Sequence, residues 1–215
     1  MLELGLKVLV AYLLGSIVGA LAIGQLRGVD IRTMGSGNAG GTNALRTQGL
    51  GFAAGTVVID IGKGWVAAGW LPVLAIPGVA ADPLIGRDWL AVCCAAAAVA
   101  GHVWPLWHEF RGGKGGATLA GVLLALAPLL LAIAAGAWLL VVMLGGFVAL
   151  GTVAAAVSVP IAVLAIAPES VPMLSLGVAI AALVAWAHRG NLARIRAGTE
   201  PHAEKLWLLR PRKAP

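Results

Sequence analysis

The feature that most constrains this chain is the segment from Ala117 to Ala167, which contains no Asp, Glu, Lys, Arg or His. As a single helix rising about 1.5 Å per residue, it would far exceed the hydrocarbon core of a bilayer, which is roughly 30 Å thick. The segment therefore has to fold back at least once. Gly145, Gly146 and Pro160 are among the available break points.

The composition of the whole chain points to the same environment. Of its 215 residues, 60% are hydrophobic and only 11% are charged, against about 25% charged in an ordinary soluble domain. The mean hydropathy of +0.94 leaves too little polar surface to cover a water-soluble core. These values exclude a soluble enzyme and predict an all-α, polytopic integral membrane protein.

Further apolar runs long enough to approach or complete a crossing lie outside the uncharged segment. They are Leu4–Gly24, Phe52–Ile76, the shorter Ala-rich run Trp89–Trp104, and Val171–Ala187. A spanning helix needs about 20 mostly apolar residues, and the accepted range extends down to about 17.

The positive charges predict which segments face the cytoplasm. Of the 15 Lys and Arg residues, twelve lie in three segments: Gln25–Leu50, His102–Thr118 and His188–Pro215. Cytoplasmic loops are enriched in Lys and Arg, so the formal charge of +6 reflects topology rather than nucleic-acid binding. One crossing precedes the first of these segments, and an even number of crossings must separate segments on the same side. The total number of spans is therefore odd. Because residues 118–187 can hold four short crossings or two long ones, we expect seven transmembrane helices, with five as the alternative. We expect one domain, residues 1–215, and a monomer.

The first cytoplasmic segment contains the run GSGNAGGTNALR, from Gly35 to Arg46. Glycines let backbone N–H groups converge on an anion, and polar side chains add donors. The run also matches a dinucleotide-binding fingerprint, but no buried strand precedes it and Asp60, at the ribose-binding position, lies in an apolar run. A flexible turn would leave the polar residues unexplained. The predicted phosphate-binding residues here are Gly35, Gly37, Asn38, Gly40, Thr42 and Asn43.

The second segment reads GHVWPLWHEFRGGKGGAT, from Gly101 to Thr118. Its glycine loop with Lys114, placed before a helix start, again predicts an anion site, although the Walker spacing is absent. The aromatic residues are typical of a membrane interface. Without further ligands at metal spacing, His102 is interpreted as a hydrogen-bonded organiser. The predicted phosphate-binding residues are Gly112, Gly113, Lys114, Gly115 and Thr118.

The third segment places His188, Asn191 and Arg194 three residues apart, near one face if the last span continues as a helix. A histidine can move protons and an asparagine can orient a substrate, whereas the arginines alone would also satisfy the positive-inside rule. The basic tail that follows, with Arg212 and Lys213, is expected near anionic headgroups.

Two charged residues fall inside an apolar run. Asp60 and Lys63 are three residues apart and can pair on a helix. Charges inside a membrane are candidates for function, and a purely structural ion pair is the equal alternative. Cys93 and Cys94 are adjacent in an apolar run and are expected to be inert buried thiols.

Together the three segments resemble the PlsY family, the bacterial membrane acyl-phosphate:glycerol-3-phosphate acyltransferases. The family patterns are close to G-S-G-N-x-G-x-T-N-x-x-R, G-H-x-x-P-x-x-x-x-F-x-G-G-K-G-x-A-T and H-x-x-N-x-x-R-x-x-x-G-x-E. Every fixed position is present, in order, across nearly the whole chain.

The resemblance implies transfer of a fatty acyl group from acyl phosphate to the 1-hydroxyl of sn-glycerol 3-phosphate, giving lysophosphatidic acid and phosphate. It implies a multi-pass protein of the bacterial cytoplasmic membrane, in contact with membrane lipid, with its motifs facing the cytoplasm. No cofactor, metal or nucleic acid is expected. It implies that Ser36, Arg46, His188 and Asn191 are catalytic and that Glu200 is a structural anchor. His102, Asp60 and Lys63, interpreted above from their positions, complete the set of expected structural residues.

Some alternatives remain open on the sequence alone. The general base is either His188 or a phosphate oxygen of the substrate. Absence of the H-x-x-x-x-D motif, typical of thioester-using acyltransferases, agrees with a donor other than acyl-CoA. A transporter for an organic phosphate and a structural membrane protein are the competing classes of function.

Overall fold

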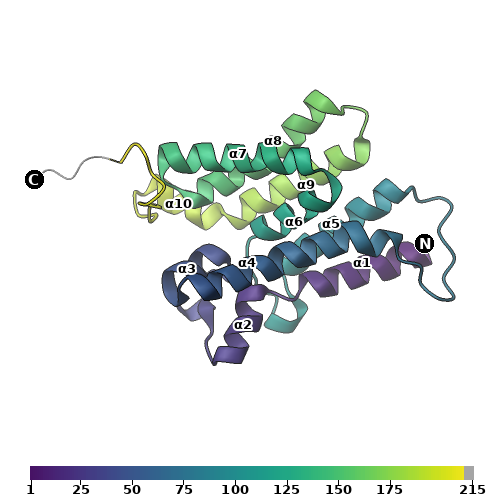
Figure 1. The fold of residues 1–215 in the computed structure, drawn as a ribbon, viewed down its shortest axis with the longest axis horizontal. Helices are drawn as coiled ribbons and strands as arrows, with labels where there is room; N and C mark the ends of the chain where they lie inside the picture. The colour runs from purple at the N-terminus through teal and green to yellow at the C-terminus, as the bar shows by residue number, and fades with distance from the viewer. Residues whose placement is uncertain (211–215) are drawn as a thin grey trace, which may run out of the picture. The chain divides into compact units, whose positions relative to one another are not determined.

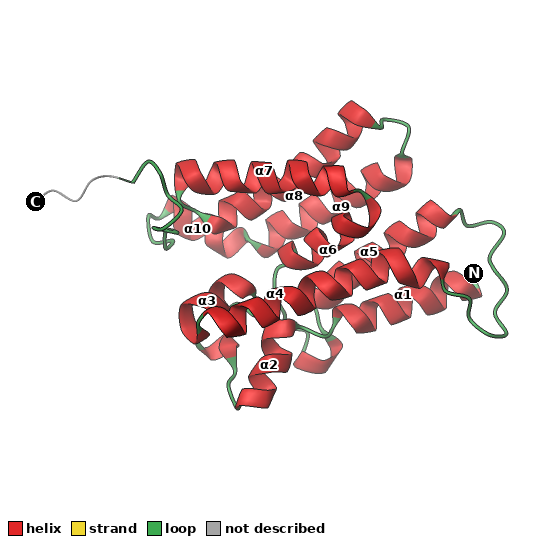
Figure 2. Ribbon diagram, in the orientation of Figure 1, coloured by secondary structure: helices red, strands yellow, loops and turns green. Residues whose placement is uncertain are grey.

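The computed structural model describes residues 1–210, which contain helices and no strand (Figures 1 and 2). The expected all-α class is confirmed. The chain divides into two compact units, Met1–Pro128 and Leu129–Pro215, which are described separately. The first contains α1 (Leu2–Gly15), α2 (Gly19–Arg27), α3 (Gly41–Gln48), α4 (Leu50–Trp65), α5 (Arg87–Val103) and α6 (Gly116–Leu126). Then come α7 (Pro128–Gly145), which starts at the boundary, α8 (Val148–Ile166), α9 (Val171–Ala187) and α10 (Arg189–Arg196). Arg212 and Lys213 of the expected basic tail lie outside the described residues.

Between residues 1 and 210, four helical segments are long and apolar enough to cross a membrane: Leu50–Val73, Arg87–His108, Pro128–Gly145 and Val148–Ile166. The number rises to six if the bent pairs α1 with α2 and α9 with α10 each count as one span. Helix α6 is a shorter apolar helix. The long uncharged segment and the run after it therefore fold into four helices, α6 to α9, rather than two.

The first apolar run is not the continuous helix that we expected over Leu4–Gly24. Helix α1 ends at Gly15, Val18 is extended, and α2 starts at Gly19 with its axis bent by 49°. The break is possible inside an apolar layer because buried polar side chains of α4 supply partners for the freed backbone groups. Those side chains are described with the site below.

Glycines let the helices of the first unit approach closely. A Cβ added at Gly15 of α1 would overlap the backbone of Ala98 in α5, and one added at Gly101 of α5 would overlap the carbonyl of Tyr12. Small residues at helix contacts are typical of membrane proteins, where association depends on close van der Waals packing. Helices α1 and α5 are thereby held together next to the second motif.

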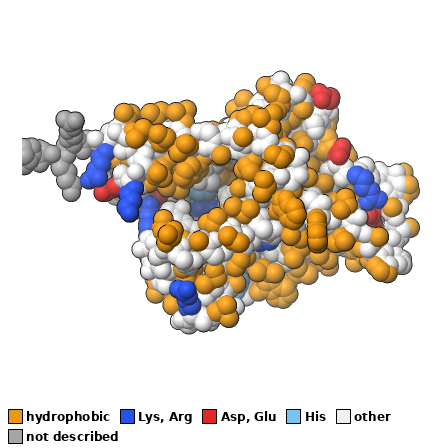
Figure 3. Space-filling model, viewed as in Figure 1, with side chains coloured by type: hydrophobic (Ala, Val, Ile, Leu, Met, Phe, Trp, Pro, Cys, Tyr) orange, Lys and Arg blue, Asp and Glu red, His pale blue; other side chains and the backbone are white. Residues whose placement is uncertain are grey.

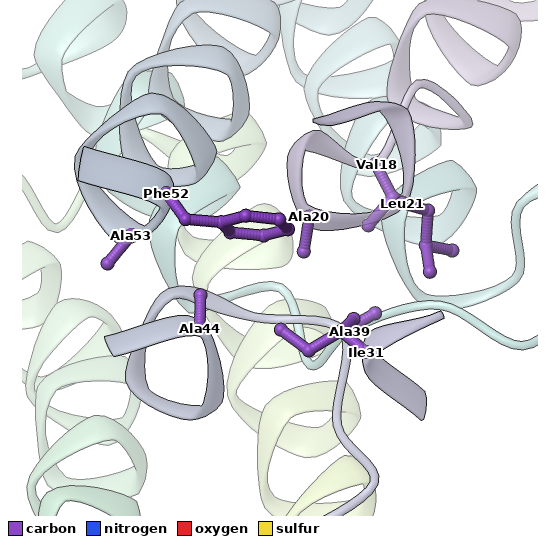
Figure 4. Packing of buried hydrophobic residues seen from close by; sticks show 8 residues of the cluster. All are labelled: Val18, Ala20, Leu21, Ile31, Ala39, Ala44, Phe52 and Ala53. Carbon is purple, nitrogen blue, oxygen red and sulfur yellow. The ribbon is translucent and has the colours of Figure 1, made fainter. Parts of the chain in front are cut away.

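A small apolar core lies under the first motif (Figure 4). Phe52 of α4 is 1% exposed and points toward Ala20 of α2, with Ala44 of α3 below the ring (Figure 4). Ile31 and Ala39, on either side of the glycine-rich turn, are fully buried in the same cluster. The turn is thus anchored at both ends while its tip remains exposed.

In the second unit, the segment after α10 caps the C-terminal end of α7. The backbone N–H of Ala203 donates to the carbonyl of Gly146 at 2.7 Å, and Trp207 Nε1 donates to the carbonyl of Leu144 at 3.1 Å. The His202 ring stacks on Trp207, with ring centroids 4.2 Å apart. Carbonyls at a helix end need partners from outside the helix, and this segment supplies them.

Much of the surface is apolar. Hydrophobic side chains cover most of the visible face in Figure 3, and Lys, Arg, Asp and Glu are few. Only 17% of the Pro128–Gly145 window is buried inside the structure. Exposed apolar surface of this extent is expected where lipid, rather than water, is the surrounding solvent.

The contact between α4 and α6 provides a test of the glycine packing. A Cβ at Gly121 of α6 would overlap the Ile61 carbonyl, whereas one at Gly62 of α4 would meet nothing within 4 Å. We expect Gly121→Ala to cost about 1–3 kcal/mol through overpacking, seen as a lower thermal midpoint in detergent. Gly62→Ala is the matched control and should leave the midpoint unchanged or raise it. Equal effects of the two substitutions would contradict this packing.

Candidate active site

Asn43 holds the first glycine-rich turn in shape. Its side-chain oxygen accepts the backbone N–H of Ser36 at 3.0 Å, and its amide nitrogen donates to the carbonyls of Ile31, Met34 and Asn38 at 3.0–3.2 Å. The side chain is 1% exposed. The amide is thus used within the turn itself, and the contact of Asn43 with phosphate stays a prediction.

The exposed tip of this turn carries the polar groups available to a ligand. Gly35 and Gly37 have φ of 54° and 71°, values that favour glycine. Ser36 between them is exposed, as are Thr42 and Arg46 in α3. Thr42 and Arg46 are four residues apart and therefore share a face of the helix.

Gly40 precedes α3 as its N-cap residue, and Asn38 is partly exposed. The first N–H groups of a helix have no partner within the helix. The start of α3 thus adds backbone donors beside the exposed hydroxyl groups and guanidinium, as expected for an anion site.

The second motif folds back over the end of α5. The N–H groups of Gly112 and Gly113 donate to the carbonyls of Val103 and His102 at 3.1 and 3.0 Å. At the tip of this loop, Glu109 and Phe110 both have positive φ. Two successive non-glycine residues in this region are unusual and concentrate at functional sites.

The end of helix α1 makes hydrogen bonds to the same loop. The hydroxyl of Tyr12 donates to the carbonyl of Trp104 at 2.7 Å, and the N–H of Leu106 donates to Ser16 Oγ at 3.2 Å. These contacts come from the last turn of α1, just before the break in the first apolar run. The position of the loop therefore depends on where α1 ends.

The glycine loop leads directly into α6. Gly115 has φ of 85° and is the N-cap residue of this helix, and Lys114 before it is half-buried. Thr118, in the first turn, is fully buried beside Gly64 of α4, and its hydroxyl has no hydrogen-bond partner within residues 1–210. The start of α6 presents backbone N–H groups. The side chain of Thr118 is instead buried against α4, and this burial does not support the predicted contact between Thr118 and phosphate.

The first and second motifs meet in space. Arg32 Nη1 donates to the carbonyl of His108 at 3.2 Å, and Gly113 lies so close to Ala39 that a Cβ would be 3.0 Å from its carbonyl oxygen. Hydrogen bonds from Arg32 also lower the pKa of Asp30. Two glycine-rich segments far apart in sequence thus form one polar surface at the ends of apolar helices.

Asp60 and Lys63 of α4 are paired, with 3.0 Å between the carboxylate and ammonium groups. Both sit at the break between α1 and α2. Lys63 donates to the carbonyls of Gly15 and Ile17 at 2.8 Å each, and Asp60 accepts the N–H of Gly19 at 3.0 Å. A cation next to a helix C-terminus and an anion next to a helix N-terminus are both favourable. The predicted pair is confirmed, and it replaces the backbone hydrogen bonds lost at the break.

The third motif lies in the second unit and converges on Glu200. Asn191 Nδ2 donates to Glu200 Oε1 at 2.6 Å, and Arg194 Nε donates to Glu200 Oε2 at 2.8 Å. Glu200 is 7% exposed. These hydrogen bonds fix the orientation of the Asn191 amide, and the structural role that the resemblance implies for Glu200 stays a prediction.

His188 occupies the bend of 54° between α9 and α10. The condition under which all three residues would share a face, that the last span continues as a helix, is not met at this bend, but Asn191 and Arg194 do share a face of α10. The His188 Nδ1 atom lies 2.8 Å from the carbonyl oxygen of Val184. Since a carbonyl only accepts, Nδ1 of His188 donates this hydrogen bond.

Two features of the site were not predicted from the sequence. The contact of Arg32 with the second loop joins residues 76 positions apart, and the local Asp30–Arg32 pair was its only available signal. The role of Asn43 depends on a turn geometry that no periodicity reveals. No group of three or more His, Cys, Asp or Glu side chains within residues 1–210 has the arrangement to hold a metal ion.

The Asp60–Lys63 pair provides the second test. Removing one partner leaves an uncompensated buried charge, which costs about 3–5 kcal/mol. We expect Asp60→Ala and Lys63→Met each to lower the thermal midpoint strongly, and the double variant to lose less than the sum. The exposed pair of Glu204 and Arg210 is the control, where Glu204→Ala should have little effect. Additive losses from the buried pair would show that the two residues act independently.

Comparison with known proteins gives a consistent result. The family model described as glycerol-3-phosphate acyltransferase matches residues 5–198. A glycerol-3-phosphate acyltransferase of Synechococcus elongatus is 45% identical over 198 residues, covering 90% of this chain and 91% of the relative. One from Pseudomonas syringae pv. tomato is 41% identical over 194 residues, covering 89% and 94%.

Two solved structures have the same fold. Both are crystal structures of PlsY, an integral membrane glycerol 3-phosphate acyltransferase. The glycerol 3-phosphate form has a TM-score of 0.80 and 32% identity, covering 93% of this chain and 94% of that chain. The lysophosphatidic acid form has a TM-score of 0.79 and 31% identity, covering 94% and 97%. This chain is therefore a multi-pass membrane protein that belongs to the glycerol-3-phosphate acyltransferase (PlsY) family.

Proposed function

We propose that the protein transfers a fatty acyl group from acyl phosphate to the 1-hydroxyl of sn-glycerol 3-phosphate. The observation that carries this proposal is the meeting of two glycine-rich, cation-bearing segments at Gly113 and Ala39, at the ends of apolar helices. Such a surface suits two phosphate-bearing substrates, one of which is a lipid. The related solved structures contain glycerol 3-phosphate and lysophosphatidic acid, which would be the acceptor and the product.

In this reaction the 1-hydroxyl oxygen bonds to the acyl carbon, and the bond from that carbon to the phosphate oxygen breaks. The hydroxyl proton passes to a base, and inorganic phosphate leaves. An acyl phosphate is already activated, so its leaving group needs charge stabilisation more than protonation. The exposed Ser36, Thr42 and Arg46 and the backbone amides beside them are assigned to this task.

The second loop is assigned to the phosphate of the acceptor. Lys114 supplies a point charge, and the start of α6 supplies backbone N–H groups and a favourable dipole. With the two loops in contact, the acceptor hydroxyl and the acyl carbon would be held close together, and this orientation lowers the barrier. A covalent intermediate on Ser36 is disfavoured because the first motif has no histidine or acid to activate the hydroxyl.

We further propose seven spans with the three motifs on the cytoplasmic side of the bacterial inner membrane, and a monomeric enzyme. The seventh crossing would be made by α6, whose 11 residues are fewer than a usual spanning helix has, counted with α4, α5, α7, α8 and the two bent pairs. Labelling of single cysteines placed at Thr47 and at Leu84 in a Cys93→Ala/Cys94→Ala background checks the orientation. In intact cells, a membrane-impermeant reagent should label the cysteine at Leu84 and leave the cysteine at Thr47 unlabelled. Any other pattern of labelling would contradict the proposed orientation.

The decisive assay supplies purified protein in detergent with glycerol 3-phosphate and either palmitoyl phosphate or palmitoyl-CoA. We expect phosphate release and lysophosphatidic acid with palmitoyl phosphate alone. Product from the CoA ester instead would retain the acyltransferase and overturn the donor. A folded protein that makes product from neither would point to transport of an organic phosphate.

The base is tested by His188→Ala. If Nε2 of His188 removes the hydroxyl proton, kcat should fall about 10²- to 10⁴-fold, the range typical of a general base. The control is His108→Ala, where the backbone carbonyl rather than the ring accepts the hydrogen bond of Arg32, and it should leave kcat nearly unchanged. A loss of about tenfold or less for His188→Ala would instead assign the proton to a phosphate oxygen of the substrate.

A further inference from the structure

His102 links the intramembrane ion pair to the second glycine-rich loop. Its backbone carbonyl accepts the N–H of Gly113 at 3.0 Å. Its ring lies against the same glycine, where Nε2 is the first atom that an added Cβ would meet. On the other side of the ring, Nδ1 is 2.9 Å from Lys63 Nζ and 3.4 Å from Asp60 Oδ1. The side chain is 3% exposed, so it is enclosed between the pair and the loop.

The polar contacts of Lys63 and Asp60 fix the orientation of this ring. Lys63 Nζ donates to the carbonyls of Gly15 and Ile17 and pairs with the Asp60 carboxylate. All three groups are acceptors and can take the three N–H donors of the Lys63 ammonium. The Nδ1 atom of His102 lies within hydrogen-bonding distance of Lys63 Nζ and close to the Asp60 carboxylate. Turning the ring over would break the contact with Lys63.

We propose that His102 is a positioning residue for glycerol 3-phosphate, and that Asp60 and Lys63 act through it. The ring sets the position of the Gly113 backbone, and with it the amides that lead into α6. The inference rests on the proposed role of this loop in binding the acceptor phosphate. It goes beyond a structural role for the cluster, because it assigns to the cluster an effect on acceptor affinity.

The geometry also explains why residue 113 is a glycine. Its φ is not in the left-handed region, since Gly115 rather than Gly113 has positive φ in this loop. The absence of a side chain is instead required by the His102 ring on one side and the Ala39 carbonyl on the other. Gly113 is thus the point at which the buried cluster, the first motif and the second motif all meet.

A double-mutant cycle tests the contact. Affinity for glycerol 3-phosphate is measured by calorimetry on the purified full-length protein without acyl donor, for Gly113→Ala, His102→Ala and the combination. Each single substitution should raise Kd at least about tenfold, because small misplacements of binding groups are costly. The double variant should be no worse than the weaker-binding single variant, since the space left by the ring accepts the new methyl group. The KM for the acyl donor should change less than about threefold, because its assigned groups lie on the first motif.

Gly112→Ala is the matched control. A Cβ there would meet the His102 carbonyl and the Pro105 ring, not the imidazole. Removing the imidazole cannot relieve that overlap, so the effects of Gly112→Ala and His102→Ala should multiply. The inference is overturned if the Gly113 pair multiplies in the same way, or if His102→Ala lowers only the thermal midpoint and leaves Kd within about twofold.

A conservative variant covers the case in which His102→Ala does not fold. His102→Asn keeps a side-chain amide that can hydrogen-bond to Lys63 or Asp60 but is too short to reach Gly113, so it should fold and still raise Kd about tenfold. Normal affinity in this variant would overturn the positioning role. If the wild-type protein binds glycerol 3-phosphate but the effects of Gly113→Ala and His102→Ala on its Kd multiply independently, only this inference is refuted. Wild-type protein that does not bind it refutes the proposed loop function together with the inference.

Discussion

The hydrogen bonding of an interrupted helix inside an apolar layer is the constraint on which the first unit depends. Once α1 stops at Gly15, its last carbonyls and the first amide of α2 need partners, because lipid offers none. Lys63 and Asp60 supply both, with opposite charges matched to the two helix ends. Burying an ion pair costs desolvation free energy, but here both side chains also satisfy backbone groups that the break leaves without helical partners. The position of the break then places Tyr12 and Ser16 under the second motif.

The same constraint shows what could be read from the sequence and what could not. The all-helical class, the apolar segments and the Asp60–Lys63 pair follow from hydropathy and spacing, which are local properties. The break after Gly15 does not, because Leu4–Gly24 is apolar enough for one helix and only the distant charges of α4 make an interruption stable. The bend at His188 escaped for the same reason. A periodicity of three residues is compatible with a straight helix and with a bent one.

The site residues divide along similar lines. Glycine-rich segments with hydroxyl groups and cations predict anion binding from residue types alone, and they do lie together. Individual roles within them depend on where each side chain faces. Asn43 is polar and lies within the motif, yet its amide is used to hold the turn. Thr118 is buried against α4. Ser36, Thr42 and Arg46 remain exposed, and only the fold distinguishes these two groups.

The segment that caps α7 bears on the order in which the second unit is made. The turn between α7 and α8 is synthesised long before Ala203 and Trp207, whose groups complete the hydrogen bonding of its carbonyls. Since chains fold progressively from the N-terminus during synthesis, this helical hairpin spends that interval with the end of α7 incomplete. The end of α7 can therefore complete its hydrogen bonding only after the segment that carries His202 and Trp207 has been synthesised.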